Sequence, residues 1–501
     1  MAKTEAGVIH DIEKIVEVVL AFNSVNDRTE LLNIILTKMM EMTHSDAGTL
    51  YIVDGDKLRF RIIHNNSYGI YQSDDIDEAS LPPITLDVDN IQNISAYSAL
   101  RNEIVNIDDV YSNDQFNFSG PKIYDRMTGY RTRAMLVIPI CTQVGEDSEV
   151  LGVIQMMNPI DPVTQEPITY GNIFSPPILP AFAKIAANTL SNLTYVNELR
   201  LLLRSFAAVM TQAIDERSPY NNNHTQYVAH YCEKFATYLS KVFPPGHKYH
   251  FDDFHIERIV LAALLHDIGK IITPLSIMDK STRLGDKFEV IRYRFELKKH
   301  QLEIDRLNNV ITEQHYRKEK EMVYDAQVFV EYVNSLGFLT EELQESIKNL
   351  HKITFRNPDG MTVNVLEPAD IEVLSVKAGT LTANERSIMQ DHAVITGKLL
   401  DKIPSWKYYK GIPDWARSHH EFLDGTGYPQ GLQGDEVPLE SCIITIMDIF
   451  DALIAKDRPY KAAVPLEKSL TILQDMAEEG KLHEELVGLF VESRLWEGVH
   501  R

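Results

Sequence analysis

The sequence predicts a multidomain fold in which an α+β domain with an antiparallel sheet is joined by a long helix to an all-α domain. Three patterns predict it: residues 1–180 alternate helical and strand-like segments, apolar positions across 182–214 recur every three or four residues, and the chain from 218 onwards is mainly helical in pattern. A chain of 501 residues also exceeds what one hydrophobic core normally serves.

The composition indicates a soluble globular protein, with 44% hydrophobic and 24% charged residues. No apolar run approaches the roughly 20 residues of a spanning helix, and the opening MAKTEAGVIHDIEK does not resemble a signal peptide, so we expect a cytoplasmic protein without membrane partners. The net charge of −23 repels nucleic acid, which excludes DNA and RNA as expected partners. An anionic substrate would require local cations, such as bound metal ions.

The cysteines Cys141, Cys232 and Cys442 lie far apart and form no CxxC pair. This spacing argues against a disulfide framework or a thiolate metal site. We therefore predict reduced thiols in the core.

In the first half, residues 9–22 and 31–42 have the apolar spacing of helices. The segment AGTLYIVDGDKLRFRIIH predicts two strands joined at Asp-Gly, a favoured hairpin turn. A second pair of strands is predicted around Gly145-Glu146-Asp147. Together these elements predict the antiparallel sheet.

The connecting segment 182–214 contains neither Pro nor Gly and carries a heptad-like apolar seam. Such a seam is typical of a parallel coiled coil between two protomers, and equally of a long helix packed on its own domain. The sequence leaves both interpretations open.

Residues 283–371 form a charge-rich amphipathic stretch, which ends with the hairpin-like ITFRNPDGMTVNVL. The pattern predicts an insertion in the second half, with a helical hairpin projecting from the core. Its many charges indicate a solvated face.

Histidines and carboxylates gather in apolar parts of the second half. If FDDFHIERIVLAALLHDIGK forms one helix, His266 and Lys270 lie one turn apart on the same face, beside Asp267. Buried charges need a partner, a metal or a substrate. Imidazole with carboxylate suits iron, manganese or zinc better than calcium or magnesium. The remaining candidates are His224, His392, the vicinal His419 and His420, and Asp448.

The ordered motifs HDIGK (266–270), HHEFLDGTGYP (419–429) and DIFDALIAKDRPYK (448–461), with His224 and His392, resemble the HD-GYP family of bacterial phosphohydrolases. Members of this family are helical and hydrolyse cyclic di-GMP at two or three metal ions, commonly iron. The resemblance implies an HD-GYP domain over 213–490, apart from the insertion.

The resemblance also implies roles for individual residues. Tyr220 stands where trinuclear members carry a glutamate, which favours two divalent ions, iron or manganese. Asp267 and Lys270 would be catalytic, with Asp267 bridging the two metals. One metal would be held by His224, His266, Asp267 and Asp448, and the other by His392, His419 and His420. Substrate would contact Lys270, Arg458 and Lys461, beside a pocket shaped by Gly427, Tyr428 and Pro429.

The first half is similar to GAF domains through the segments 102–117, 128–140 and 151–158, which implies a regulatory GAF domain over 1–193. Asn158 is followed by Pro159, and Phe174 lacks a following Asp-Glu, so the cyclic-nucleotide pattern of this family is incomplete. A sensor for an unknown small molecule and a dimerisation scaffold both remain open. We expect a homodimer formed through this domain and the connecting helix.

The resemblances imply a dimeric enzyme that hydrolyses cyclic di-GMP to pGpG, with further cleavage to GMP left open. One alternative keeps the enzyme and changes the substrate to 3′,3′-cyclic GMP-AMP. Another is a non-catalytic receptor that binds the dinucleotide or a protein partner. Hydrolysis of mononucleotides or alarmones is disfavoured by the HHE-x-x-DGTGYP motif.

Overall fold

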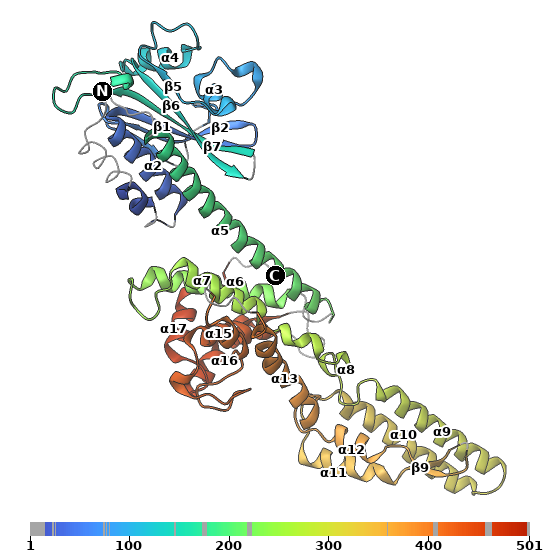
Figure 1. The fold of residues 1–501 in the computed structure, drawn as a ribbon. Helices are drawn as coiled ribbons and strands as arrows, with labels where there is room; N and C mark the ends of the chain where they lie inside the picture. Colours follow the sequence, from blue (N-terminus) through green and yellow to red (C-terminus); the bar gives the residue numbers. More distant parts are fainter. Residues whose placement is uncertain are drawn as a thin grey trace. The chain divides into compact units, whose positions relative to one another are not determined.

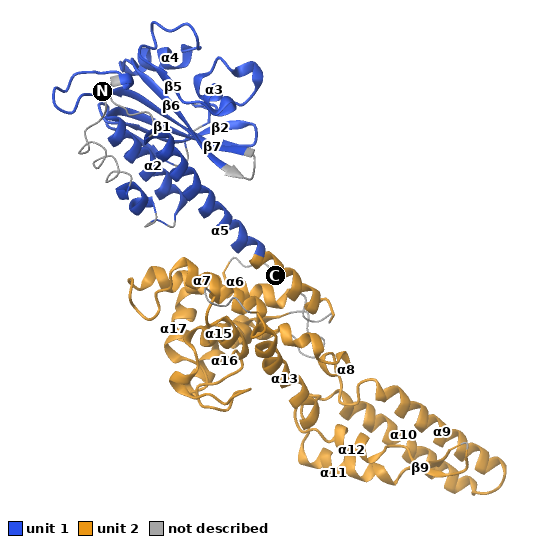
Figure 2. Cartoon of the chain, viewed as in Figure 1, with its two compact units in different colours: residues 1–202 blue, residues 203–501 orange. Residues whose placement is uncertain are grey.

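The computed structural model describes residues 16–22, 25, 27–73, 76, 78–79, 81–144, 147–172, 178–217, 223–357, 359–403, 409–455 and 463–497. The chain divides into two compact units, residues 1–202 and 203–501 (Figure 2). The boundary falls within helix α5, Ile178–Asp215. None of the described helices combines the length and the apolar character needed to cross a membrane.

The first unit is built on an antiparallel sheet of strand order β3-β2-β1-β7-β6-β5, with β4 paired to β2 (Figure 1). The strands are β1 Ser45–Asp54, β2 Lys57–Asn65, β3 Ile70–Ser73, β4 Ile84–Thr85, β5 Val105–Ile107, β6 Met135–Val144 and β7 Asp147–Pro159. Its helical elements before α5 are α2 Arg28–Thr43, η1 Val88–Asn90, α3 Ile94–Arg101, α4 Ser119–Thr128 and η2 Tyr170–Asn172.

Alternating side chains give the sheet two apolar faces. Leu50 and Ile154 lie in the cluster formed with α2 and the start of α5. Tyr51 and Val153, one position along each strand, lie in a second cluster with α3. The α+β architecture with an antiparallel sheet is therefore confirmed.

Local patterns predicted this unit well. The helix at 31–42 lies within α2, and the first hairpin pairs Asp54 with Lys57 across a turn in which Gly55 has a φ of +59°. That left-handed value favours glycine. Val144 pairs with Asp147 in the second hairpin. Of the predicted first helix, 16–22 is helical and 9–15 lies outside the described residues.

Helix α5 confirms the predicted helix over 182–214. At its start, Phe182 and Ala186 are buried in the core of the first unit, which agrees with packing on its own domain. Further along, Leu199 and Phe206 are exposed. Within a single chain, the seam is therefore buried at its start and exposed beyond it.

The second unit is mainly helical. Outside the predicted insertion its elements are α6 His224–Val242, α7 Asp253–Leu265, η3 Ile268–Ile272, α8 Leu275–Met278, α13 Ala383–Leu400, α14 Ile412–Arg417, η5 Gly434–Glu436, α15 Leu439–Ile454, α16 Leu466–Glu478 and α17 Glu484–Ser493. Helices α6, α7 and α15 share one core, which includes Phe235, Ile259 and Phe450. The Thr382/Glu385 capping box starts α13. The cysteines Cys141, Cys232 and Cys442 are free, as predicted.

The prediction that one helix continues through Lys270 was wrong. Helix α7 ends at Leu265, and a 3-10 helix follows in which Lys270 N donates to Asp267 O at 2.9 Å. Side chains three residues apart nearly eclipse in such a helix. Lys270 therefore pairs with Asp267, and it does not share a continuous helix face with His266 as predicted.

The segment 283–371 contains α9 Lys287–Leu307, α10 Glu313–Ser335, α11 Glu341–Asn349, η4 Leu350–Lys352, β8 Thr354–Arg356, β9 Thr362–Asn364 and α12 Pro368–Leu374. These elements bury a hydrophobic cluster of their own, which includes Phe295, Val330 and Leu366. Strands β8 and β9 pair, as the hairpin-like sequence predicted. The helical pair α9 and α10 thus carries a core as well as a solvated face.

Arg283 joins the two ends of this segment. Its side chain is fully buried and donates to Val376 O and Val333 O, each at 3.0 Å, and to Leu336 O. Burial lowers the pKa of this guanidinium. The backbone of Arg283 also donates to Asn334 O, so this one residue ties the C-terminal end of α10 to the segment after α12.

We expect Arg283→Ala to destabilise the segment by about 2–5 kcal/mol, because it leaves several buried carbonyl groups without a hydrogen-bond donor. Arg292→Ala is the control, since Arg292 is exposed and pairs only with Glu289 on its own helix among the described residues. Surface pairs of that kind contribute about 0.5 kcal/mol. Urea unfolding combined with limited proteolysis of 283–371 measures both variants. Equal effects would contradict the role given to Arg283.

Candidate metal centre

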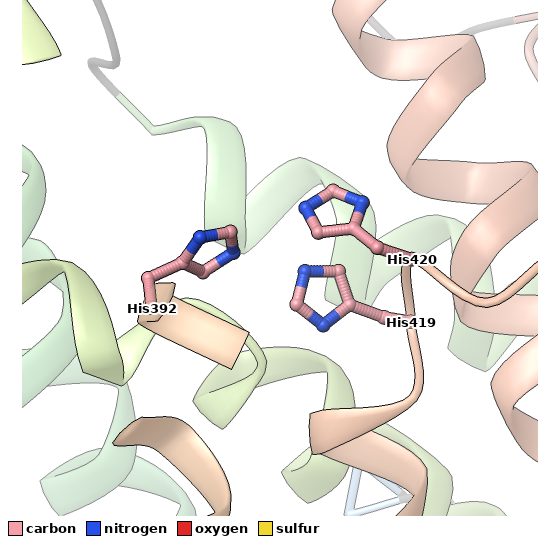
Figure 3. Close-up of side chains that lie close together, drawn as sticks. All are labelled: His392, His419 and His420. Atoms are coloured by element: carbon pink, nitrogen blue, oxygen red, sulfur yellow. The ribbon is translucent and has the colours of Figure 1, made fainter. Parts of the chain in front are cut away.

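The packing of the second unit brings together all the side chains predicted to bind metal. Three groups of ligand atoms form, each with its atoms within 4.8 Å of one another: His392 with His419 and His420, His224 with His266 and Asp448, and His266 with Asp267 and His419. They come from α6, the end of α7, α13, the turn after α14, and α15. Figure 3 shows the first group, whose three rings converge from α13 and from the turn after α14.

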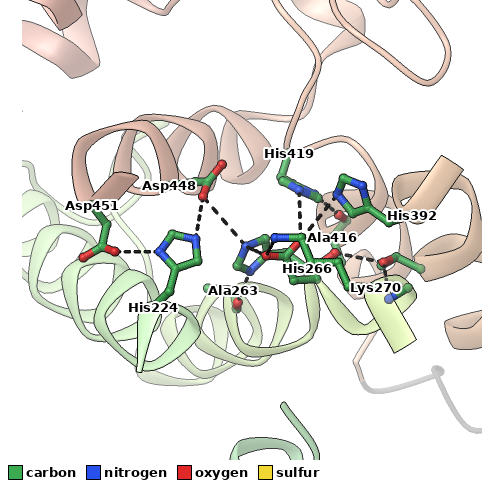
Figure 4. Close-up of polar contacts among 12 residues, drawn as sticks. His224, Ala263, His266, Lys270, His392, Ala416, His419, Asp448 and Asp451 are labelled. Carbon is green, nitrogen blue, oxygen red and sulfur yellow. Dashed lines mark hydrogen bonds and ion pairs between the residues drawn. The ribbon is translucent and has the colours of Figure 1, made fainter. Parts of the chain in front are cut away.

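Three of the imidazoles are oriented by their own backbone. The Nδ1 atoms of His266, His392 and His419 each lie 2.6 Å from the carbonyl oxygen three residues earlier (Figure 4). A carbonyl can only accept, so Nδ1 carries the proton and Nε2 has a free lone pair. This tautomer is the one that binds a metal through Nε2.

Those free lone pairs point into the centre. The Nε2 atoms of His266, His392 and His419 and the Oδ1 atom of Asp267 are buried and have no hydrogen-bond partner among the described residues. Buried polar atoms are almost always satisfied in proteins. Bound cations would satisfy all four atoms at once, and the residues present therefore fit a metal centre.

Asp267 lies between the two groups of histidines. Its Oδ2 atom is 3.1 Å from His266 Nε2 and 2.6 Å from Lys270 Nζ, whereas Oδ1 is 3.4 Å from His392 Nε2. Burial raises the pKa of Asp267, but the charge of Lys270 outweighs burial and holds it well below its usual range. The carboxylate is ionised and presents one oxygen to each side.

The electrostatics differ between the two sides of the centre. Burial and neighbouring imidazoles lower the pKa of His419, and burial is the main cause that brings the pKa of His420 to about 4. Burial also lowers the pKa of His392. These three rings are neutral near pH 7, the state in which imidazole binds a metal.

His224 has a different environment, because two carboxylates flank it. Its Nδ1 is 2.6 Å from Asp451 Oδ2, and its Nε2 is 3.0 Å from Asp448 Oδ1. Burial lowers the pKa of His224, but the hydrogen bonds to Asp448 and Asp451 outweigh it and raise the pKa to about 10. A cation at Asp448 would compete with this proton and leave Nε2 free as a ligand.

Sequence reasoning missed several residues that support the predicted ligands. Asp451, one turn after Asp448 on α15, orients His224. Thr445 Oγ1 donates to His419 O at 2.7 Å, and Thr396 Oγ1 donates to His266 O at 2.9 Å. Helical spacing from a ligand (i+3 for Asp451, i+4 for Thr396 after His392) was an available signal.

Thr396 also accepts a hydrogen bond from Gly269 N at 3.0 Å, so it joins η3 to α13. We expect Thr396→Val to destabilise the metal-free unit by about 1–3 kcal/mol, because both backbone groups become unsatisfied while the volume is kept. Thr237→Val is the control, because the Thr237 hydroxyl donates to Glu233 O of its own helix. Thermal unfolding in chelator compares the two variants, and equal melting temperatures would contradict the prediction.

The turn after α14 borders the centre. Glu421 is buried and accepts from Gln430 N at 2.6 Å and Leu432 N at 3.0 Å, which closes the loop. The Tyr428 ring lies against the His420 ring, with centroids 4.7 Å apart, and Tyr428 N donates to His420 O. Beside Tyr428 lie the other two residues of the predicted pocket, Gly427 and Pro429.

The predicted phosphate contacts Arg458 and Lys461, and the position Tyr220, lie outside the described residues.

Comparison with known proteins agrees with this arrangement. Two HD domain profiles match residues 222–377 and 365–486, and the GAF domain profile matches residues 27–169. This chain has an N-terminal GAF domain followed by an HD domain. The HD domain is related to those of HD-GYP cyclic di-GMP and cyclic GMP-AMP phosphodiesterases.

Three curated relatives illustrate the relationship. The 3′3′-cGAMP-specific phosphodiesterase 3 of Vibrio cholerae is 46% identical over 99 residues, which are 20% of this chain and 21% of the relative. The cyclic di-GMP phosphodiesterase of Thermotoga maritima is 37% identical over 117 residues, 23% of this chain and 31% of the relative. The cyclic di-GMP phosphodiesterase response regulator RpfG of Xanthomonas campestris is 38% identical over 109 residues, 22% of this chain and 28% of the relative. The chain thus spans less than a third of each of these relatives.

Proposed function

We propose that this protein is a metal-dependent phosphodiesterase that hydrolyses cyclic di-GMP to the linear dinucleotide pGpG. The observation that carries the proposal is the set of buried, unpartnered Nε2 and carboxylate atoms that converge on Asp267. By name, the relatives of the HD domain are phosphodiesterases of cyclic dinucleotides.

The donor set suits two iron or manganese ions. His224, His266 and Asp448 would hold one ion, His392, His419 and His420 would hold the other, and Asp267 would bridge them. When bound, such ions acidify a water molecule and stabilise charge on phosphoryl oxygens.

The chain's own residues would bind and orient the substrate. Lys270 keeps its ammonium group 2.6 Å from Asp267 Oδ2, with part of the side chain exposed. Burial lowers the pKa of Lys270, but the Asp267 carboxylate outweighs burial and raises it, so the group stays charged. It would donate to a phosphate oxygen next to the bridging carboxylate. We also propose phosphate contacts for Arg458 and Lys461, and a pocket wall formed by Gly427, Tyr428 and Pro429.

A second substrate, 3′,3′-cyclic GMP-AMP, is favoured by one specific observation. The relative that is 46% identical over 99 residues carries that specificity in its name. The two dinucleotides differ in one purine, and both present the same phosphodiester groups.

A product assay on the full chain tests both substrates. Protein purified without oxygen and loaded with Fe²⁺ or Mn²⁺ receives the two dinucleotides in parallel, and the products are separated chromatographically. We expect pGpG from cyclic di-GMP. Faster turnover of cyclic GMP-AMP than of cyclic di-GMP would make cyclic GMP-AMP the preferred substrate. Intact substrates in protein shown to hold two metals would overturn hydrolysis and favour a receptor.

We also propose that two copies pair along α5. Beyond the part buried in the first unit, exposed apolar side chains follow the alternating three and four spacing of a coiled coil: Val196, Leu199, Leu203, Phe206 and Met210. Such a seam is buried when two parallel helices wrap around each other. The GAF domain would then act on a dimeric enzyme.

Phe206→Glu is expected to convert the dimer into a monomer, because it places a charge in the centre of the seam. Ser205→Glu adds the same charge to an exposed neighbour that lies off the seam, and it should leave the dimer intact. Light scattering after size-exclusion chromatography measures both masses. A monomeric wild-type protein, or equal effects of the two variants, would refute pairing along α5.

A further inference from the structure

Arg217, two residues after the end of α5, reaches the segment that carries Lys270. Its Nη1 atom donates to Lys270 O at 3.1 Å and also to Ile271 O, and its Nη2 atom lies 3.4 Å from Thr273 O. A single guanidinium therefore contacts three backbone carbonyl groups at the end of η3 (Ile268–Ile272). None of the metal ligands makes this contact.

Such a contact stabilises the backbone most at the C-terminal end of a helix. The last carbonyl groups of a helix lack intrahelical donors and carry partial negative charge. The planar, five-donor fork of arginine can satisfy several of them at once, whereas the ammonium of lysine acts as a point charge. Arg217 thus fixes the backbone of Lys270, whose Nζ lies 2.6 Å from Asp267 Oδ2.

A second group from the same end of α5 interacts electrostatically with the centre. Asp215, the last residue of α5, is buried and interacts electrostatically with Asp267, His224 and Lys270. The end of α5 and the residues that follow it thus influence the Asp267–Lys270 pair in two ways, through the charge of Asp215 and through the hydrogen bonds from Arg217 to the backbone.

We propose that Arg217 is a positioning residue. It fixes η3 and thereby holds the Lys270 ammonium in a position from which it can donate to a substrate phosphate. The proposal extends the proposed function and relies on it for the catalytic consequence. Its structural part, the clamping of η3, does not depend on turnover. Arg217 acts through Lys270 and does not itself touch the substrate.

Steady-state kinetics of the metal-loaded full chain test the catalytic part. We expect Arg217→Ala to raise KM about tenfold, with kcat changed less than about threefold and with two metals retained, because charged hydrogen bonds that hold Lys270 are lost. Arg217→Lys should recover part of the affinity. Arg204→Ala is the matched control: Arg204 lies on α5 and pairs with Glu233 of α6 at 2.6 Å, away from η3.

A double-mutant cycle tests whether Arg217 acts through Lys270. If it does, Arg217→Ala adds less than about twofold to the KM effect in a Lys270→Ala background. Full additivity of the two substitutions would overturn the proposal. Loss of metal from Arg217→Ala would overturn it too, because the residue would then support the whole centre and not Lys270.

Hydrogen exchange measured by mass spectrometry provides a readout independent of activity. We expect amides in the segment 266–275 to exchange about tenfold faster in Arg217→Ala than in wild type or Arg204→Ala, because the clamp on η3 is gone. Unchanged exchange would overturn the inference whatever the turnover. Faster exchange in a protein that hydrolyses neither dinucleotide would refute the proposed function and leave the clamp standing.

Discussion

Replacing Asp267 with Ala is expected to lower dinucleotide hydrolysis by about a thousandfold or more, on the scale seen when a group that stabilises the transition state is removed. Asp267 offers one oxygen to each side of the centre, with Oδ1 3.4 Å from His392 Nε2 and Oδ2 3.1 Å from His266 Nε2. Its loss also removes the partner of the Lys270 ammonium. Product chromatography measures turnover, and elemental analysis should show fewer than two metals per chain.

Two further variants define the origin of the loss. Asp267→Asn keeps the shape and removes the charge, so we expect it to bind metal more weakly than wild type and to be nearly as inactive as the alanine variant. Asp414→Ala removes a carboxylate from an exposed position on α14 and should behave as wild type. An Asp267→Ala protein with two metals and turnover within tenfold of wild type would contradict the bridging role.

Gly269→Ala is expected to have the second largest effect, because η3 and α13 touch at this residue. A Cβ atom there would lie 2.0 Å from His392 O and 2.8 Å from Thr396 N. Both are backbone atoms and cannot rotate away, so the two elements must separate. Overpacking of this kind costs about 1–3 kcal/mol and more when backbone must move. The separation also moves His392 away from Asp267, and metal binding should fall with stability.

Gly488→Ala is the matched control, because a Cβ atom at that position of α17 meets nothing within 4 Å. Alanine should stabilise this helix by up to about 1 kcal/mol. Thermal unfolding with and without Mn²⁺, together with metal content, compares the two variants. If Gly269→Ala unfolds at the wild-type temperature and keeps both metals, the close contact between η3 and α13 is not essential.

Elements with strong local signals were predicted well from the sequence. The helix at 31–42, the long helix at 182–214 and the hairpin at Gly55 depend on near neighbours in the chain, through apolar spacing and a turn residue with positive φ. The end of α7 was not predicted. Just after that end, Gly269 packs closely against α13, which lies more than a hundred residues further along the chain.

The sequence by itself determined the fold class and the residues that could form the centre, because helix periodicity and the HDIGK and HHEFLDGTGYP motifs are local. Only the tertiary structure decided which partners those residues meet. His224 contacts Asp451 across 227 positions, Gly269 contacts Thr396 across 127, and Arg217 contacts the backbone of Lys270 across 53. Such pairs arise when buried faces of separate helices pack together, and no short stretch of sequence encodes that packing.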